Sequence, residues 1–129
     1  MSGEINYTPV MAGPVIEGYD PHPLCLADVV RVHDGDTVLV RVQLEVGISA
    51  EVWVRLEGYN SPELHGPHKA LALEATQALK DFLAQGQVLV KLTGAITFDR
   101  RVGRVFVALD GKPVDASEHL ARFNVTQGQ

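Results

Sequence analysis

Strict alternation in two neighbouring segments is the feature of this sequence that most limits its fold. Residues 37–46 and residues 50–58 place an apolar side chain at every second position, and a short turn at residues 47–49 separates them. A period of two is typical of a β-strand that has one face in a core and the other facing solvent. The two segments therefore predict a hairpin. Its expected inner face consists of Val38, Val40, Val42, Leu44, Val52, Val54 and Leu56.

Three further strands are expected around this hairpin. One covers residues 24–33 and precedes the hairpin in the chain. The others cover residues 88–92 and 103–109, and the polar residues 97–101 are expected to form a loop between them. The candidates for the inner face of the first strand are Leu26, Val30 and Val32.

Residues 67–85 have the pattern of an amphipathic helix between the third and fourth strands. Pro67 suits the first turn of a helix, and Gly86 suits its end. Apolar residues recur between them at helical spacing, so one stripe of the helix is expected to face the core. The members of that stripe are Leu71, Ala75, Ala78, Leu79 and Phe82.

The expected elements predict an α+β fold that is mainly β: a five-stranded OB-type barrel with a capping helix and a short C-terminal helix. Asp115 or Ser117 is expected to cap the C-terminal helix, because both side chains can accept a hydrogen bond from a free helical N–H. The proline-rich residues 1–23 are expected to form an extended N-terminal arm. Residues 24–123 then form the barrel domain, and residues 124–129 form a polar tail.

Size and composition exclude several classes of protein. A chain of 129 residues is long enough for one domain with a core. Cys25 is the only cysteine, so the chain cannot form an internal disulfide, and we expect a small buried apolar side chain there. No apolar stretch predicts a membrane span and no signal peptide is evident, so we expect a cytoplasmic protein of a kind encoded by bacteria or bacteriophages. The formal net charge of −5 argues against a broad basic surface for nucleic acid.

Arg55 and Glu63 are the pair of residues that most suggests chemistry. Arg55 belongs to the outward-facing set of the strand over residues 50–58, and the loop that ends this strand carries Glu63. An arginine can bind a phosphate through two hydrogen bonds, and a glutamate can accept a proton from water. The turn at residues 34–36 is expected at the same end of the sheet. For the pair alone, an exposed ion pair without a function is the alternative.

Three blocks of the sequence resemble the signature blocks of the staphylococcal nuclease (thermonuclease) family. They are residues 32–37 (VHDGDT), residues 55–63 (RLEGYNSPE) and residues 99–104 (DRRVGR), in the family's order and at similar spacing. The turn at residues 110–114 also resembles the family's turn after the last strand. The resemblance covers about residues 26–123.

This resemblance implies an OB-fold, calcium-dependent phosphodiesterase that acts on DNA or RNA, with single strands favoured. Glu63 matches the family's general base, and Arg55 and Arg104 match its two phosphate-binding arginines. A general base would activate water, and the arginines would stabilise the charge that develops on the phosphate oxygens.

The resemblance also implies a set of calcium ligands. Asp36 matches the family's first ligand aspartate, Asn60 lies where the family often has a second aspartate, and Ser61 lies where it offers a backbone carbonyl. Ca²⁺ accepts carboxylate, amide and carbonyl oxygens together. An amide carries no charge, so Asn60 predicts weak binding, with a dissociation constant of about 10⁻⁴–10⁻³ M.

Other interpretations of these residues stay open. The same fold with weak or no catalysis would be a nucleic-acid-binding or structural module in a larger assembly. Residues 1–23 could then bind a protein partner or a second copy of the chain. His65 and His68 could bind a transition metal together with a carboxylate, or they are solvated loop residues. Arg100 and Arg101 could contact phosphate or lie in a solvated loop, and Trp53 is expected to be a packing or rim residue.

Overall fold

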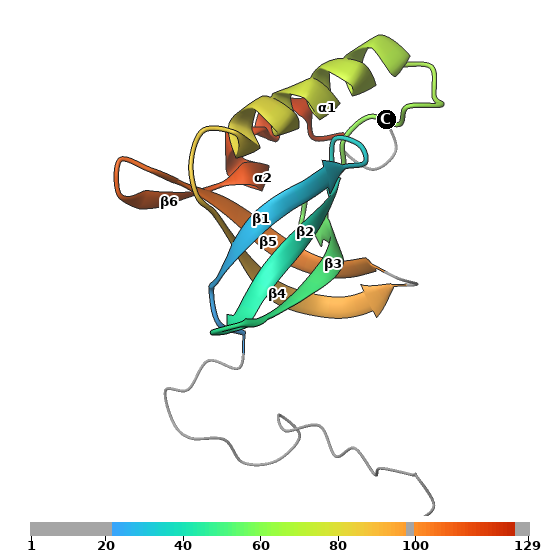
Figure 1. Cartoon of the computed structure of the whole chain (residues 1–129). Helices are drawn as coiled ribbons and strands as arrows, with labels where there is room; N and C mark the ends of the chain where they lie inside the picture. Colours follow the sequence, from blue (N-terminus) through green and yellow to red (C-terminus); the bar gives the residue numbers. More distant parts are fainter. Residues whose placement is uncertain (1–21, 98–99, 126–129) are drawn as a thin grey trace, which may run out of the picture.

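The computed structural model describes residues 22–97 and 100–125, which form a barrel of strands with helices at one end (Figure 1). The expected N-terminal arm lies outside the described residues, except for His22 and Pro23. The elements in chain order are β1 (Cys25–Val32), β2 (Thr37–Glu45), β3 (Ile48–Leu56), α1 (Lys69–Leu83), β4 (Val88–Thr97), β5 (Arg100–Leu109), β6 (Lys112–Asp115), α2 (Ala116–His119) and the 3₁₀ helix η1 (Ala121–Phe123).

The strands form one sheet that closes on itself. Their order is β3-β2-β1-β4-β5-β6, and every neighbouring pair in this order is antiparallel. A parallel pairing between β3 and β5 closes strands β1 to β5 into a mixed barrel. This arrangement confirms the predicted five-stranded, OB-like barrel with a capping helix and a short C-terminal helix. No helix among the described residues is long and apolar enough to cross a membrane.

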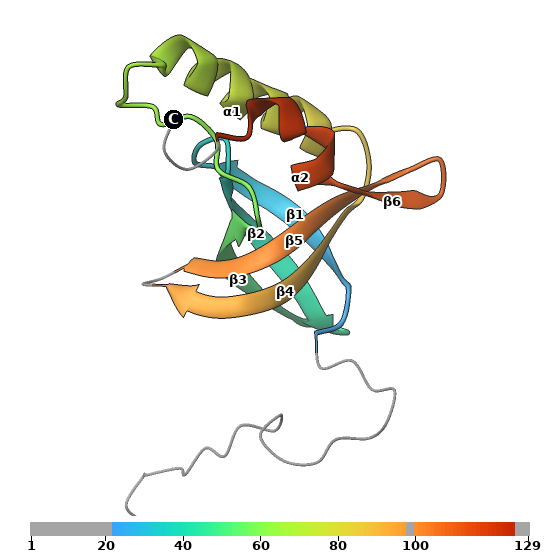
Figure 2. The same cartoon turned by 180° about the vertical axis from the view of Figure 1, so that it is seen from behind.

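The core lies inside the barrel and under α1, which runs across one end of it (Figures 1 and 2). The predicted hairpin supplies much of this core, because Val38, Val40 and Val54 are fully buried. The helix contributes Ala72, Ala75, Leu79, Phe82 and Leu83. On the same end of the barrel, α2 lies beside α1, and the ring of His119 stacks on Phe82 with 4.4 Å between centroids.

A β-bulge corrects the predicted inner face of β1. Leu26 and Val30 are 52% and 41% exposed, whereas Ala27 is buried. The register to β2 shifts between Val29 and Arg31, so one extra residue changes which side chains face the core. A bulge interrupts the alternation of inward and outward side chains, which is why alternation alone wrongly predicted Leu26 and Val30 on the inner face.

Two other predicted core residues are exposed. Leu44 is 56% exposed because it lies near the open tip of the β2–β3 hairpin, beyond the side chains that fill the barrel. Leu71 in the first turn of α1 is 41% exposed, and Ala72 is buried in its place. Cys25 is partly rather than fully buried and packs against the core.

The second half of the sheet is more extensive than the sequence predicted. Strand β4 continues to Thr97, and Arg100 and Arg101 pair with it as part of β5 instead of forming a loop. The register shifts between Leu92 and Ile96, and this irregularity hides the alternation from a sequence pattern. Residues 112–115 form a sixth strand after the turn at Asp110, an element that the sequence did not predict.

Candidate functional site

The β1–β2 turn and the loop after β3 meet at one end of the barrel. Thr37 pairs with Arg55 across the two strands, and the Leu56 N–H donates to the Asp36 carbonyl at 2.9 Å. Gly35 permits the close approach of the two loops, because a Cβ at this position would lie 2.6 Å from the Ser61 Cβ. The structure therefore brings together the turn and the loop that the hairpin register predicted to be neighbours.

Asp36 is the central acid of this cluster. Its carboxylate is almost fully buried; Oδ2 accepts from the Ser61 N–H at 3.0 Å, and Oδ1 accepts from the Thr37 hydroxyl at 3.0 Å. Burial raises the pKa of the Asp36 carboxyl above its ordinary value, and the neighbouring Asp34 raises it further, against the opposing effects of Arg55 and the Ser61 N–H. Arg55 and the Ser61 N–H thus do not fully offset the cost of burying the negative charge of Asp36, and an additional cation would offset more of it.

Arg55 lies between the predicted metal ligands. One terminal nitrogen is 3.4 Å from the Asp36 carboxylate and donates to the Tyr59 carbonyl at 3.0 Å. The other donates to the Asn60 side-chain oxygen. The side-chain oxygens of Asp36 and Asn60 thus converge on one guanidinium, which is 31% exposed.

The segment after η1 holds the backbone of Asn60 from both sides. The Asn60 N–H donates to the side-chain oxygen of Asn124 at 2.9 Å, and the Val125 N–H donates to the Asn60 carbonyl at 2.7 Å. Two residues that the sequence assigned to a polar tail are therefore in contact with the candidate site. The remainder of that predicted tail, residues 126–129, lies outside the described part of the chain.

Arg104 lies on the same outer face as Arg55, held by a different acid. Val102 pairs with Arg55, and Arg104 follows two residues later on β5, so both arginines point outward. Its Nε and one terminal nitrogen donate to Asp115 Oδ2 at 2.8 Å and 2.5 Å. Its other terminal nitrogen is 3.7 Å from Glu57. The bonds to Asp115 are the main reason that the pKa of Arg104 is raised.

Asp115 has a second role as the predicted N-cap of α2. It is 5% exposed, and its Oδ1 accepts from the Ser117 N–H at 2.7 Å. The sequence indicated this cap but not the ion pair with Arg104. The signal for the pair was the turn at Asp110, because a hairpin after β5 returns the chain along that strand and brings Asp115 beside it.

Glu63 is near the cluster in sequence but is not bonded to it. Its side chain is exposed, and within residues 22–97 and 100–125 its carboxylate has no hydrogen bond and no ion pair. Its carbonyl accepts from the Gly66 N–H at 3.2 Å, which makes a tight turn directly after the buried Pro62. The structure therefore brings Asp36, Arg55, Asn60 and Ser61 into contact and leaves the carboxylate of Glu63 free in the same loop.

The donors at this site fit a hard cation better than a transition metal. Asp36 supplies a carboxylate and Asn60 an amide, the Ser61 carbonyl belongs to the same loop, and Asp34 accepts from the Asp36 N–H at 3.0 Å. Oxygen donors of these kinds suit Ca²⁺. His65 and His68 are exposed, and the described residues contain no group of three or more His, Cys, Asp or Glu side chains placed to hold a metal.

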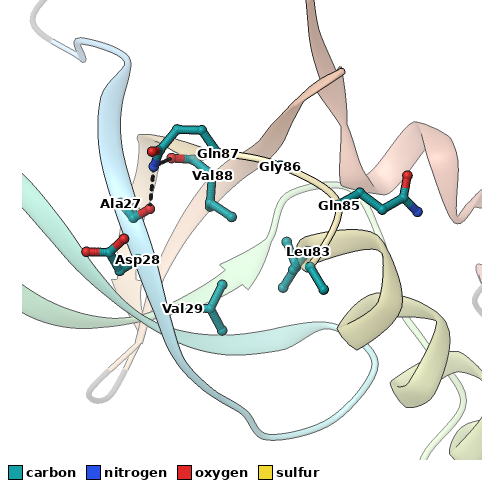
Figure 3. Close-up of a pocket in the computed structure, with 9 residues that line it drawn as sticks. Ala27, Asp28, Val29, Leu83, Gln85, Gly86, Gln87 and Val88 are labelled. Atoms are coloured by element: carbon teal, nitrogen blue, oxygen red, sulfur yellow. Dashed lines mark hydrogen bonds between the residues drawn. The ribbon is translucent and has the colours of Figure 1, made fainter. Parts of the chain in front are cut away.

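A pocket elsewhere on the domain contains none of these residues. It lies between β1 and the connection from α1 to β4, where the Gln87 side chain donates to the Ala27 carbonyl at 3.0 Å (Figure 3). Its lining includes Val29 and Leu83, with Asp28 as its one charged residue. It offers no arrangement of groups for phosphate chemistry.

Tyr59 is buried close to the site, and its hydroxyl has no hydrogen-bond partner among the described residues. Burial, with the charge of Asp36, raises the pKa of Tyr59 from 10.0 to about 12. Because the pKa of Tyr59 is higher in the folded protein than in the unfolded chain, the protonated hydroxyl favours the folded state. The free energy of unfolding therefore has its full value below pH 10 and falls as the pH rises toward 12.

We expect Tyr59→Phe to abolish this alkaline loss of stability. Urea unfolding of the unaltered protein should show a loss of about 1 kcal/mol between pH 8 and pH 11 that the variant lacks. At pH 8 the variant should be at least as stable, because it removes a buried hydroxyl that has no partner. Equal losses in both proteins at pH 11 would show that Tyr59 ionises as easily folded as unfolded.

In comparisons with models of known protein families and with curated proteins, no match to this chain was found. The resemblance to the nuclease family therefore stays an inference from the three sequence blocks.

Proposed function

We propose that this protein is a Ca²⁺-dependent nuclease that hydrolyses phosphodiester bonds in single-stranded DNA or RNA. The observation that carries the proposal is the convergence of the Asp36 and Asn60 side-chain oxygens on the guanidinium of Arg55, with the Ser61 N–H bonded to Asp36. An oxygen cluster of this kind beside an outward-facing arginine suits an anionic phosphate together with a hard cation. The three sequence blocks point to the same chemistry.

Asp36, Asn60 and the Ser61 carbonyl would hold the Ca²⁺ ion, which when bound would neutralise part of the phosphate charge. Arg55 is partly exposed, so its guanidinium can turn from Asp36 and Asn60 toward a phosphate oxygen. Arg104 has one terminal nitrogen with only a 3.7 Å contact to Glu57, and this nitrogen is the one available to a second oxygen. Both arginines would stabilise the charge that grows on the phosphate during attack.

Glu63 would act as the general base. An exposed carboxylate without a partner can accept a proton from a water molecule at neutral pH. The water oxygen forms a bond to phosphorus as Glu63 takes its proton. The bond from phosphorus to the 5′ oxygen breaks, and this oxygen leaves with the bonding pair and takes up a proton from solvent. The buried Pro62 restrains the backbone next to Glu63, which limits the positions that the carboxylate can adopt.

The second candidate function is an OB-fold module that binds nucleic acid or a protein without cleaving. The observation that favours it is that both phosphate-binding arginines are engaged by acids, Arg55 by Asp36 and Arg104 by Asp115. Asn60 also lowers the negative charge that would attract a cation. These features suit a site with weak or no catalysis as well as an active site that has no substrate bound.

Removal of the metal separates the two functions. We expect cleavage of a labelled single-stranded DNA in millimolar Ca²⁺, with half-maximal activity at about 10⁻⁴–10⁻³ M, and no cleavage in EDTA. Circular dichroism in EDTA serves as the control, since the described barrel has an apolar core of buried side chains and its fold should not depend on the ion. Absence of cleavage by folded protein in Ca²⁺, Mg²⁺ and Mn²⁺ would reject the nuclease and favour the binding module.

A further inference from the structure

A row of four side chains crosses the outer face of the barrel next to the candidate site. Arg31 of β1 pairs with Leu39 of β2, Leu39 pairs with Trp53 of β3, and Trp53 pairs with Arg100 of β5. Residues directly opposite one another on neighbouring strands project to the same face. The row therefore has an apolar and aromatic centre with an arginine at each end.

Trp53 is the platform at the centre of this row. It is only partly buried, as is Leu39, so both belong to the surface rather than to the core. The guanidinium carbon of Arg31 lies 5.2 Å from the centroid of the Trp53 ring, and the ring of His33 meets it edge-on at 5.9 Å. The planar side chains of Arg31 and His33 thus contact this indole, and a nucleobase is a flat ring that can make a stacking contact of the same kind.

The two arginines of the row are not paired with an acid of the described part of the chain, since neither Arg31 nor Arg100 takes part in an ion pair there. By contrast, Arg41 on the same face is bonded to Glu51 at 2.8 Å. The row is thus locally basic in a chain whose formal net charge is −5.

The row also lies at a useful distance from Arg55. Trp53 and Arg55 are two residues apart on β3 and face the same way, which separates them by about 6.6–6.8 Å along the strand. A nucleotide whose phosphate is bound at Arg55 can therefore extend its base toward Trp53.

We infer that Trp53, which lies between Leu39 and Arg100 in the row and has the Arg31 guanidinium over its ring, is a nucleobase-stacking subsite for single-stranded nucleic acid. The identity of this ligand rests on the proposed function, because the phosphate site supplies the neighbouring contact. Aromatic platforms between basic side chains bind single strands with little sequence preference, since every base has a flat face. A duplex keeps its bases stacked on one another and cannot use such a platform.

Fluorescence can test the subsite directly, because Trp53 is the only tryptophan in the chain. The unaltered protein in EDTA, and Glu63→Gln in Ca²⁺, would be titrated with a single-stranded oligonucleotide and with an abasic strand of equal length. We expect saturable quenching by the oligonucleotide and a much smaller change with the abasic strand. Equal signals from the two strands, or none from either, would overturn the subsite.

Binding of a dye-labelled oligonucleotide, followed by anisotropy, gives a second measurement. Trp53→Leu keeps an apolar side chain and should weaken binding by about 5- to 150-fold, the range for loss of one stacked base. Arg31→Gln should weaken binding more than Lys112→Gln, which removes the same charge from the first residue of β6, outside the row. Unchanged affinity in both Trp53→Leu and Arg31→Gln would contradict the inference, and the fluorescence titration decides it if Trp53→Leu does not fold.

The subsite and the nuclease can fail separately. Base-dependent quenching without cleavage would support the subsite and reject the nuclease. Cleavage without any change in Trp53 fluorescence would support the nuclease and overturn the subsite.

Discussion

Replacement of Glu63 by glutamine should lower the rate of single-stranded DNA cleavage by about 10²- to 10⁴-fold, the usual contribution of a general base. Glutamine preserves the size of the side chain but cannot accept the proton from water. The fold should not change, because the Glu63 carboxylate is exposed and has no bonds to lose within the described part of the chain. Cleavage kinetics in saturating Ca²⁺, together with urea unfolding of the same samples, measure both effects.

Glu74→Gln is the matched control for this prediction. Glu74 is an exposed glutamate on α1, outside the candidate site, and its replacement removes the same charge from the protein. It should cleave at the normal rate. If Glu63→Gln also cleaves at the normal rate, Glu63 is not the base, and the loop after β3 keeps only its proposed part in metal binding.

The barrel was predictable because its central hairpin obeys a simple rule. Each of β2 and β3 has one face in the core, so the alternation of Val38, Val40 and Val54 reports the true inner face. In β1 the bulge after Val29 changes the phase of that pattern, and in β4 a shift after Leu92 has the same effect. An irregularity of one or a few residues is set by contacts between strands, which periodicity within one strand cannot detect.

The candidate site was predictable to the extent that it depends on neighbouring strands. Asp36 and Arg55 meet because they lie at adjacent ends of β2 and β3, and the hairpin register implies this contact. The bond from Asn60 to Asn124 joins residues 64 positions apart, and no local pattern points to it. The Trp53 row was missed for the same reason, since it requires the pairing of β3 with β5 that closes the barrel.

Charge in this protein is organised locally. Asp36 faces Arg55, and Asp115 faces Arg104, so each proposed phosphate-binding arginine is held in place by a buried acid. Such pairing keeps a guanidinium oriented before substrate arrives. Phosphate binding would then require Arg55 to turn from Asp36, whereas Arg104 can keep its bonds to Asp115 and offer its other terminal nitrogen. An acidic chain can therefore still offer a small, defined site for an anion.

Arg104→Gln should separate the structural role of this arginine from its proposed role in catalysis. The change leaves Asp115 buried with a charge that only the Ser117 N–H contacts among its described bonds. Loss of one partner of a fully buried ion pair costs about 3–5 kcal/mol. Because the Arg104 side chain is 40% exposed, we expect a smaller loss of about 2 kcal/mol in the free energy of unfolding, measured in urea.

The double variant Arg104→Gln/Asp115→Asn should recover much of this stability. Asparagine can still accept the hydrogen bond from Ser117 and leaves no unpaired charge in the interior. Cleavage should stay about 10²- to 10³-fold below normal in both Arg104→Gln and the double variant, because neither has a guanidinium to stabilise the phosphate charge. If activity returns together with stability, Arg104 serves only to hold Asp115 and α2, and the phosphate is bound by Arg55 without it.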